Sequence, residues 1–313
     1  MSNWKIMLTD GLEENGKDIL SQEAQVDDKK GISAEDLLKI VADYDALIVR
    51  GRTKVTGQVF EAAKNLKVVG RSGVGVDNID LQAAKDHHVT VVNAPIATTR
   101  AVAELAIGLI FALAREISRA DSSMKADQWL KKEFEGVELD GKTLGVIGLG
   151  RIGSTVASMA KPLGMKVIAC DPILTEDHIR SCGCEPCEWE ELLNQSDFIT
   201  IHTPLIDSTR NMINAETISK MKDGVRIVCA ARGGIVDEAA LLSALDSGKV
   251  RGAALDVFAT EPPVESKLVK HPHVITTPHI GGQTIEAQTR AAEDIATEVL
   301  AALNGKTLRW KVS

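Results

Sequence analysis

Residues 143–153 constrain the fold of this chain more than any other stretch, because a strand-like sequence runs directly into a glycine-rich turn. They read TLGVIGLGRIG: the apolar run stops at Gly148, and Gly150 and Gly153 complete a G-x-G-x-x-G pattern before a helical stretch. The first glycine permits a tight turn, the second lets a pyrophosphate approach the backbone, and the third lets helix pack against strand. Phosphates then meet a helix N-terminus, where free N–H groups favour negative charge. The stretch therefore predicts a dinucleotide-binding turn.

A second apolar strand, residues 166–170, ends in Asp171. This acid follows the glycines by about 20 residues, where a dinucleotide fold places the carboxylate that binds the adenosine ribose hydroxyls. A carboxylate repels a 2′-phosphate, and the next residue is Pro172 instead of an arginine. We therefore expect NAD, not NADP, as the cofactor. The alternative is a tight turn in another kind of α/β protein, which the combination of strand, helix and acid disfavours.

Strands and helical patterns alternate along the rest of the chain in two blocks, which predicts right-handed βαβ units and parallel sheets. We expect two doubly wound parallel-sheet domains of the α/β class. The Rossmann-like NAD-binding domain, residues 97–284, is inserted in a discontinuous substrate-binding domain, residues 1–96 and 285–313. The expected strands are residues 5–8, 46–50, 67–71, 89–93, 143–148, 166–170, 198–201, 225–229, 252–256 and 274–277. The expected helices include residues 34–41, 59–63, 80–87, 102–113 and 284–304.

Composition excludes several classes of partner. A formal net charge of −8 argues against nucleic acid and anionic membranes, although local positive charge can still bind a small anionic substrate. No apolar run approaches the ~20 residues that span a bilayer, and the first ten residues lack the apolar region of a signal peptide. Five cysteines, an odd number, indicate free thiols in a reducing compartment, so we expect a cytoplasmic protein.

Three of these cysteines, Cys182, Cys184 and Cys187, lie within six residues of one another. With His178 as a fourth ligand they offer a zinc site, but a structural zinc site needs four ligands at workable spacing. The alternative is a set of unpaired cysteines in a surface connection, and we expect no metal.

Polar residues follow three of the predicted strands of the second block. In open α/β sheets ligands bind at the carboxyl ends of strands, and Arg232, Glu261 and His279 all lie just beyond such ends. A guanidinium pairs bidentately with a carboxylate, and an imidazole beside a carboxylate is an acid/base that works near neutral pH. Oxidation of a hydroxy acid needs such a clamp and such a base, while hydride leaves toward a nicotinamide.

Each of these residues also has an ordinary interpretation. Arg232 can be surface charge in a glycine-rich loop, Glu261 a turn acid before two prolines, and His279 a structural histidine. His202 also follows a strand and is the rival base.

The motifs GLGRIG, HTP, ARGGIVDE, LDVFATEPP and TPHIGG, in this order, make nearly the whole chain resemble the D-isomer-specific 2-hydroxyacid dehydrogenases. The resemblance implies that Arg232, Glu261 and His279 are the catalytic trio, with His279 as general acid/base. Besides the three glycines, it implies NAD contacts at Arg151, Ile152, Asp171, Thr203, Ala230, Asp256 and Gly281.

Within the family, the resemblance is to members that oxidise 3-phospho-D-glycerate. It implies that the loop of Ser72, Gly73 and Val74 binds the substrate carboxylate. Arg50, Lys54 and Arg71 are the nearest cationic candidates for a substrate phosphate, and Lys131 is expected to reach the same site from a neighbouring subunit.

Two departures bear on these expectations. Residues 97–99 read Ala-Thr-Thr where many such members carry Gly-Asn-Ser or Gly-Asn-Thr, and the sequence does not extend into C-terminal regulatory domains. Another D-2-hydroxy acid, such as glycerate or lactate, is the same-class alternative. An NAD(H)-sensing corepressor is the alternative from another class.

Apolar residues between the two blocks predict a homodimer, since one helix face cannot hide them all and a symmetry mate would cover the excess. They are Ile107, Ile110, Phe111, Ile117, Trp129, Leu130 and Phe134.

Overall fold

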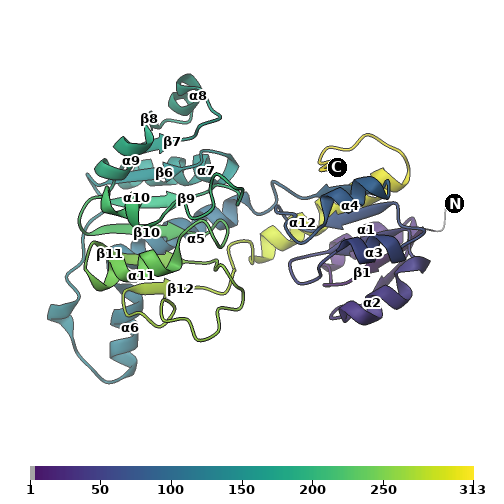
Figure 1. Cartoon of the computed structure of the whole chain (residues 1–313), viewed down its shortest axis with the longest axis horizontal. Helices are drawn as coiled ribbons and strands as arrows, with labels where there is room; N and C mark the ends of the chain where they lie inside the picture. The colour runs from purple at the N-terminus through teal and green to yellow at the C-terminus, as the bar shows by residue number, and fades with distance from the viewer. Residues whose placement is uncertain (1–3) are drawn as a thin grey trace. The chain divides into compact units, whose positions relative to one another are not determined.

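The structure, a computed structural model, describes residues 4–313 and divides into two compact units. Unit 1 combines the chain up to Thr98 with Gly282–Ser313, and unit 2 is Thr99–Gly281 (Figure 1). Among the described residues, no helix has the length and apolar character to cross a membrane.

Unit 1 is built on a five-stranded sheet in which every strand pair is parallel. Its strands are apolar runs of four or five residues, except for the edge strand β2, whose sequence is AQVDD. In order across the sheet they are β2 (Ala24–Asp28), β1 (Trp4–Leu8), β3 (Ala46–Val49), β4 (Val68–Arg71) and β5 (Thr90–Asn93).

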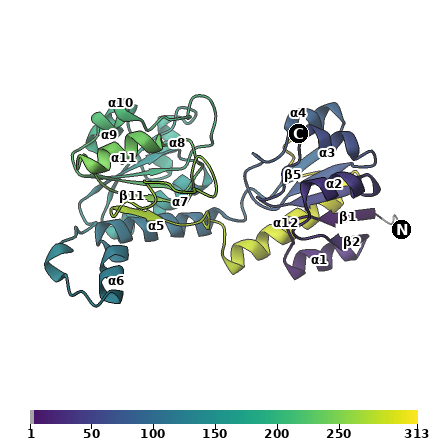
Figure 2. The same cartoon turned by 60° about the horizontal axis from the view of Figure 1, so that its bottom comes forward.

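Helices cover both faces of this sheet, because successive strand residues point to opposite sides. Met7 packs into the cluster under α2, α3 and α4, whereas its neighbours Ile6 and Leu8 pack under α1 and α12 (Figure 2). Helix α12 therefore returns the end of the chain to the unit in which the chain begins. These helices are α1 (Glu14–Ser21), α2 (Ala34–Ile40), α3 (Gly57–Ala62), α4 (Leu81–Asp86) and α12 (Ile285–Leu303), with a 3-10 turn η1 (Val41–Asp43) after α2.

Unit 2 contains a seven-stranded, fully parallel sheet whose strand order reverses between β6 and β9. Ligands bind beyond the carboxyl ends of strands at such a reversal. Across the sheet the strands are β12 (Val274–Thr276), β11 (Val250–Leu255), β10 (Val225–Cys229), β9 (Phe198–Ile201), β6 (Thr143–Ile147), β7 (Lys166–Cys170) and β8 (Glu185–Pro186).

Two groups of helices enclose this second sheet. Side chains of α5, α7 and α8 share one buried cluster with the strands, and those of α9, α10 and α11 share the other. The helices are α5 (Thr99–Ala114), α7 (Arg151–Ala160), α8 (Glu176–Ser181), α9 (Trp189–Gln195), α10 (Ala215–Ser219) and α11 (Glu238–Asp246), with a 3-10 turn η3 (Lys161–Leu163) after α7.

An arm projects from the body of unit 2 after α5. It consists of α6 (Ile117–Lys125), the 3-10 turn η2 (Lys131–Glu133) and their connections, and it extends away from the sheet (Figures 1 and 2). At its base Glu116 adopts φ +51° and is almost fully buried, pairing with Arg119 and, at 3.2 Å, with Arg251.

The predicted fold class is confirmed: both units are α/β domains with parallel sheets covered on both faces. The elements α1, β2, α6, α8, β8, α10 and α11 were not predicted from the sequence. Strand β2 lies at the sheet edge, and of its five residues Ala24 and Val26 pack against the core. Its sequence therefore shows no clear alternation of apolar and polar residues. The shorter of these helices present only one or two buried residues each, too few to show a helical period.

Candidate active site

The glycine-rich turn joins β6 to α7 at the reversal of the strand order. Gly148 adopts φ +83°, and a Cβ there would lie 2.8 Å from Thr203 Cγ2 and 3.0 Å from the backbone of His202. A larger residue would therefore be strained in its own backbone and would strike the neighbouring loop after β9. Gly153 is equally restricted, since a Cβ would lie 2.1 Å from the carbonyl oxygen of Gly148. These two glycines hold turn, helix and strand in close contact.

Gly150 opens the turn to a ligand. It caps α7 without a side chain that could accept from the first helical N–H groups. Apart from its chain neighbours and its own helix, no described residue has an atom within 4 Å of the position of its Cβ. A ten-residue helix thus begins with available donors and open space, which suits a pyrophosphate. Arg151 is exposed and Ile152 half-buried in this first turn.

Asp171 follows β7, next to the turn. One carboxylate oxygen accepts from Leu149 N at 2.8 Å, and the other accepts from Ile173 N at 3.0 Å. The carboxylate is thus fixed beside the glycines, and each oxygen keeps a lone pair for a ribose hydroxyl. The residues present therefore fit NAD.

Glu261 and His279, which are 18 residues apart in sequence, are brought together by the loops after β11 and β12. Nδ1 of His279 lies 2.8 Å from Oε2 of Glu261. Oε1 of the same carboxylate accepts from Phe258 N at 3.1 Å, so Glu261 is oriented by its own loop. With Nδ1 engaged, Nε2 is the nitrogen left to exchange a proton with a ligand, and the pair has the arrangement of an oriented acid/base.

Asp256 holds the loop that carries His279. Its buried carboxylate accepts from the Thr277 hydroxyl at 2.6 Å and from Ile280 N and Gly281 N, each at 2.8 Å. His279 itself has φ +53° and donates its N–H to the Asp256 carbonyl at 2.9 Å. The loop is therefore fixed on both sides of the histidine.

Arg232 follows β10, the strand beside β11. It is half-buried, and Nη1 donates to the carbonyl of Ala231 at 2.7 Å. Ala230, buried, leads into this loop from the end of the strand. All three residues of the predicted trio thus lie on loops at the carboxyl edge of one sheet, together with the glycine-rich turn.

His202, the rival base, is engaged elsewhere. Its Nε2 lies 2.8 Å from the hydroxyl of Thr200, its Nδ1 is buried, and burial lowers the pKa of His202 to about 4. The ring is therefore neutral near pH 7 and a weak acceptor for a substrate proton. Thr203, the next residue, is half-buried beside Gly148.

The predicted substrate residues of unit 1 also lie at the carboxyl edge of its sheet. Arg50 follows β3, its N–H donates to Asp10 Oδ2 at 2.8 Å, and its guanidinium lies 3.4 Å from Glu13 Oε1. Asp10 also accepts from the N–H and hydroxyl of Thr53. Because β1 and β3 are neighbours across the reversal of the strand order, Arg50 lies at the edge where open α/β sheets typically bind ligands.

The loop after β4 carries the remaining candidates of unit 1. Arg71 Nη1 donates to the carbonyl of Ser72 at 3.1 Å, and a Cβ at Gly73, φ +140°, would lie 1.5 Å from that same nitrogen. Gly73 thus makes room for the guanidinium. Ser72 is buried, and its hydroxyl has no hydrogen-bond partner among residues 4–313; Val74 is half-buried and Lys54 is exposed.

Lys131 lies in η2 on the arm of unit 2 and is exposed. It belongs to none of the loops that carry the trio.

The cysteine cluster does not form a metal site in the part of the chain that the structure describes, where no three His, Cys, Asp or Glu side chains are placed to bind one ion. Cys184 is buried and Cys187 half-buried, and burial raises their thiol pKa values to about 11 and about 12.

Sequence reasoning missed two groups that shape the site. Asp10 organises the loops around Arg50, and Glu238 contacts the Glu261 loop through Ala259 N at 2.7 Å. The position of Asp10 just after the first strand is the sequence feature that could have indicated its role. No local sequence pattern indicates the contact that Glu238 makes.

Comparison with known proteins supports this architecture. Residues 107–281 match the family model of the D-isomer specific 2-hydroxyacid dehydrogenase, NAD binding domain. A Synechocystis sp. protein named D-3-phosphoglycerate dehydrogenase is 46% identical over 309 residues, which cover 99% of this chain and 56% of that protein. The chain spans about half the length of the curated relatives it matches.

Two solved structures match over almost their full length. A glyoxylate reductase from Paecilomyes thermophila has a TM-score of 0.91 at 31% identity, with 100% of this chain and 99% of that chain covered. An NAD-dependent formate dehydrogenase from Staphylococcus aureus, solved in complex with NAD, has a TM-score of 0.88 at 30% identity, with 97% of each chain covered. The family model covers more than half of this chain, including the glycine-rich turn and the trio. The chain therefore belongs to the D-isomer specific 2-hydroxyacid dehydrogenase family, and unit 2 carries its NAD-binding domain.

Proposed function

We propose that this protein oxidises 3-phospho-D-glycerate to 3-phosphohydroxypyruvate with NAD, the first step of serine biosynthesis. The observation that carries the chemistry is the 2.8 Å Glu261–His279 pair on the same sheet edge as the glycine-rich turn. The choice of substrate is supported by 46% identity, over 99% of this chain, to a relative named for that substrate.

Three side chains divide the work on the hydroxy acid. Arg232 clamps the substrate carboxylate, because a guanidinium fork matches two carboxylate oxygens. Nε2 of His279 accepts the hydroxyl proton as the C2–O bond becomes a carbonyl, and Glu261 stabilises the imidazolium that forms. The turn between β6 and α7 and the Asp171 carboxylate would hold NAD, which would supply the hydride acceptor for this oxidation. In the reverse direction His279 returns the proton to the new hydroxyl.

Unit 1 supplies further groups for the anionic parts of the substrate. We assign additional backbone contacts with the carboxylate to the loop at Ser72 and Gly73. The phosphate is assigned to Arg50, Lys54 and Arg71, which lie on the loops after β3 and β4. A phosphate on Arg50 would compete with Glu13 for its guanidinium.

A panel of 2-keto acids tests the substrate assignment. With NADH consumption as readout, 3-phosphohydroxypyruvate is expected to give the highest kcat/KM, at least tenfold above hydroxypyruvate, glyoxylate and pyruvate. Arg50→Ala should remove most of that preference and leave hydroxypyruvate little changed, because only the phosphorylated acid needs the extra cation. A higher kcat/KM on an unphosphorylated acid would reject the phosphoglycerate assignment.

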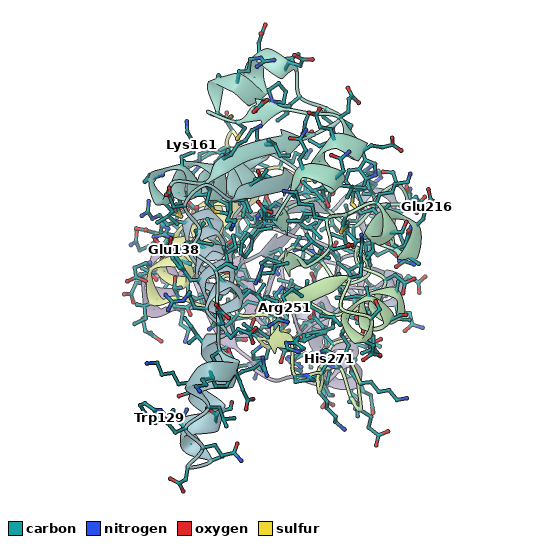
Figure 3. The ribbon with its side chains drawn as sticks, turned by 90° about the vertical axis from the view of Figure 1, so that its left-hand side faces the viewer. Trp129, Glu138, Lys161, Glu216, Arg251 and His271 are labelled. Atoms are coloured by element: carbon teal, nitrogen blue, oxygen red, sulfur yellow. The ribbon has the colours of Figure 1, made fainter. Side chains whose placement is uncertain are left out.

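We further propose that the protein is a cytoplasmic homodimer assembled through the α5–α6 region. Exposed apolar side chains gather there: Phe111 is 38%, Ile117 51%, Met124 53% and Trp129 77% exposed. Trp129 lies on the projecting arm (Figure 3). Ile110 does not contribute, contrary to the sequence analysis, because it is fully buried in the core of unit 2.

A groove beside the arm supports the dimer proposal. It has a volume of about 420 Å³ and lies between α6 and η2 on one side and the segment before β12 on the other. Leu130 and Phe134 line it together with Arg119 and His271, so the groove offers both apolar and polar groups to a partner. Such a patch is typical of an interface between subunits.

A dimeric mass at micromolar concentration is expected by light scattering. Phe111→Asp should give monomers, whereas Ile285→Asp, which places the same charge on an exposed isoleucine of unit 1, should not. If Lys131 reaches the partner's substrate, the monomeric variant should show a raised KM for the keto acid and an unchanged NADH affinity. A wild-type monomer with full activity would contradict the proposal.

A further inference from the structure

The N-terminus of α11 contacts the loop that carries Glu261. The helix is capped by Asp237, whose side chain accepts from Ala239 N and Ala240 N, so Glu238 in the first turn is not required as a cap. Instead, the Glu238 carboxylate extends to the next loop and accepts from Ala259 N at 2.7 Å. Residues 21 apart in sequence are joined by this bond.

The two loops also touch through their backbones. A Cβ at Gly233 would lie 1.8 Å from the carbonyl oxygen of Phe258 and 2.7 Å from Ala259 N. Only a glycine at position 233 lets the Arg232 loop approach the loop after β11 this closely. The contact is with Phe258 and Ala259, and Glu238 accepts from the N–H of Ala259. The loop after β11 is therefore fixed against the loop after β10 at Phe258 and Ala259.

The fixed segment leads directly to the acid/base. Phe258, next to the bond at Ala259, donates its N–H to Oε1 of Glu261 at 3.1 Å. The other oxygen of Glu261 lies 2.8 Å from His279 Nδ1. From Glu238 to His279 the series of contacts is unbroken: carboxylate to Ala259 N–H, Phe258 N–H to Glu261, and Glu261 to the imidazole.

We propose that Glu238 is a positioning residue for the acid/base pair. It holds residues 258–259, these orient the Glu261 carboxylate, and that carboxylate fixes the ring of His279. Glu238 needs no contact with substrate or cofactor. The inference rests on the roles proposed above for Glu261 and His279, and it adds a residue on α11 to the groups on which turnover depends.

Two substitutions at one position separate positioning from charge. In Glu238→Gln the side-chain carbonyl can still accept from Ala259 N, whereas Glu238→Ala cannot make the bond. We expect the alanine variant to lower kcat roughly tenfold at unchanged KM and NADH affinity, less than the ~10² that a 1 Å misplacement costs. The glutamine variant should retain most of the wild-type kcat.

Glu216→Ala is the matched control. Glu216, labelled in Figure 3, is also an acid in the first turn of a helix of unit 2, and its carboxylate pairs with the exposed Lys220 at 3.2 Å. Both alanine variants lose a similar favourable interaction with a helix dipole, so similar melting temperatures are expected. Only Glu238→Ala should lose turnover.

A double-mutant cycle tests the route through Glu261. Because Glu261→Gln already disrupts the pair, adding Glu238→Ala should lower kcat by less than twofold further. A full tenfold loss in that background would overturn the proposal, since Glu238 would then act by another route.

A readout that does not depend on turnover is the ring N–H proton of His279, assigned by NMR through its loss in His279→Ala. We expect a downfield signal in wild type and Glu238→Gln, and a broadened one in Glu238→Ala. An unchanged signal in Glu238→Ala would overturn the proposal. If no 2-keto acid is reduced, the proposed function fails, while this signal still decides the role of Glu238.

Discussion

His279→Ala is expected to lower kcat by a factor on the order of 10² to 10⁴, because it removes the group that accepts and returns the substrate proton. NADH should bind as before, since the turn between β6 and α7 and Asp171 lie on other loops of unit 2. Stopped-flow reduction of 3-phosphohydroxypyruvate gives the rate, and quenching of NADH fluorescence gives the affinity. His178→Ala, at an exposed histidine on α8, is the control and should match wild type.

Near wild-type turnover in His279→Ala would indicate that His202, and not His279, is the general base. The structure argues against that outcome, because His202 Nε2 is engaged by Thr200 at 2.8 Å and burial lowers the pKa of its ring to about 4. The His202 ring is therefore a weak base near neutral pH. His279 Nδ1, by contrast, lies 2.8 Å from the Glu261 carboxylate, which leaves Nε2 for a substrate proton.

Part of this site could be predicted from sequence, because its determinants are local. The glycines at 148, 150 and 153 mark their own turn, and the strand that ends at Asp171 follows within one βαβ unit. Glu261 and His279 are distant along the chain, yet each follows an apolar strand. Parallel strands bring their carboxyl ends to one edge, so a meeting of such residues can be expected from topology.

Other parts depend on contacts for which no motif exists. Glu238 meets Ala259 only because the loops after β10 and β11 touch at Gly233, and a sequence does not reveal which backbones come that close. Asp256 was expected to contact NAD, and that contact stays a prediction. The structure gives its buried carboxylate a further task, since it accepts three hydrogen bonds from the loop around His279.

The edge strand β2 was missed for a different physical reason. It has one neighbour in the sheet, and three of its five residues, Gln25, Asp27 and Asp28, are polar. Strand propensity and hydrophobic periodicity are visible in a sequence only where side chains are buried. Strand β2 is held mainly by backbone pairing with β1, so its sequence shows neither.

Arg232→Ala is expected to reduce kcat/KM on every 2-keto acid by a factor on the order of 10² to 10³, about 3–4 kcal/mol, because a substrate carboxylate would be left without its charged partner. Arg232→Lys keeps the charge but loses the planar fork, so it should recover only part of the rate. Arg180→Ala, at an exposed arginine paired with Glu176 on α8, should leave kcat/KM unchanged.

The loss in Arg232→Ala should be the same for phosphorylated and unphosphorylated acids, since all of them carry the carboxylate, whereas the effect of Arg50→Ala should depend on the phosphate. This contrast assigns each arginine to one end of the substrate. Full turnover in Arg232→Ala would remove the carboxylate clamp from unit 2, and loss of turnover with retained cellular function would instead favour an NAD(H)-dependent binding role over catalysis.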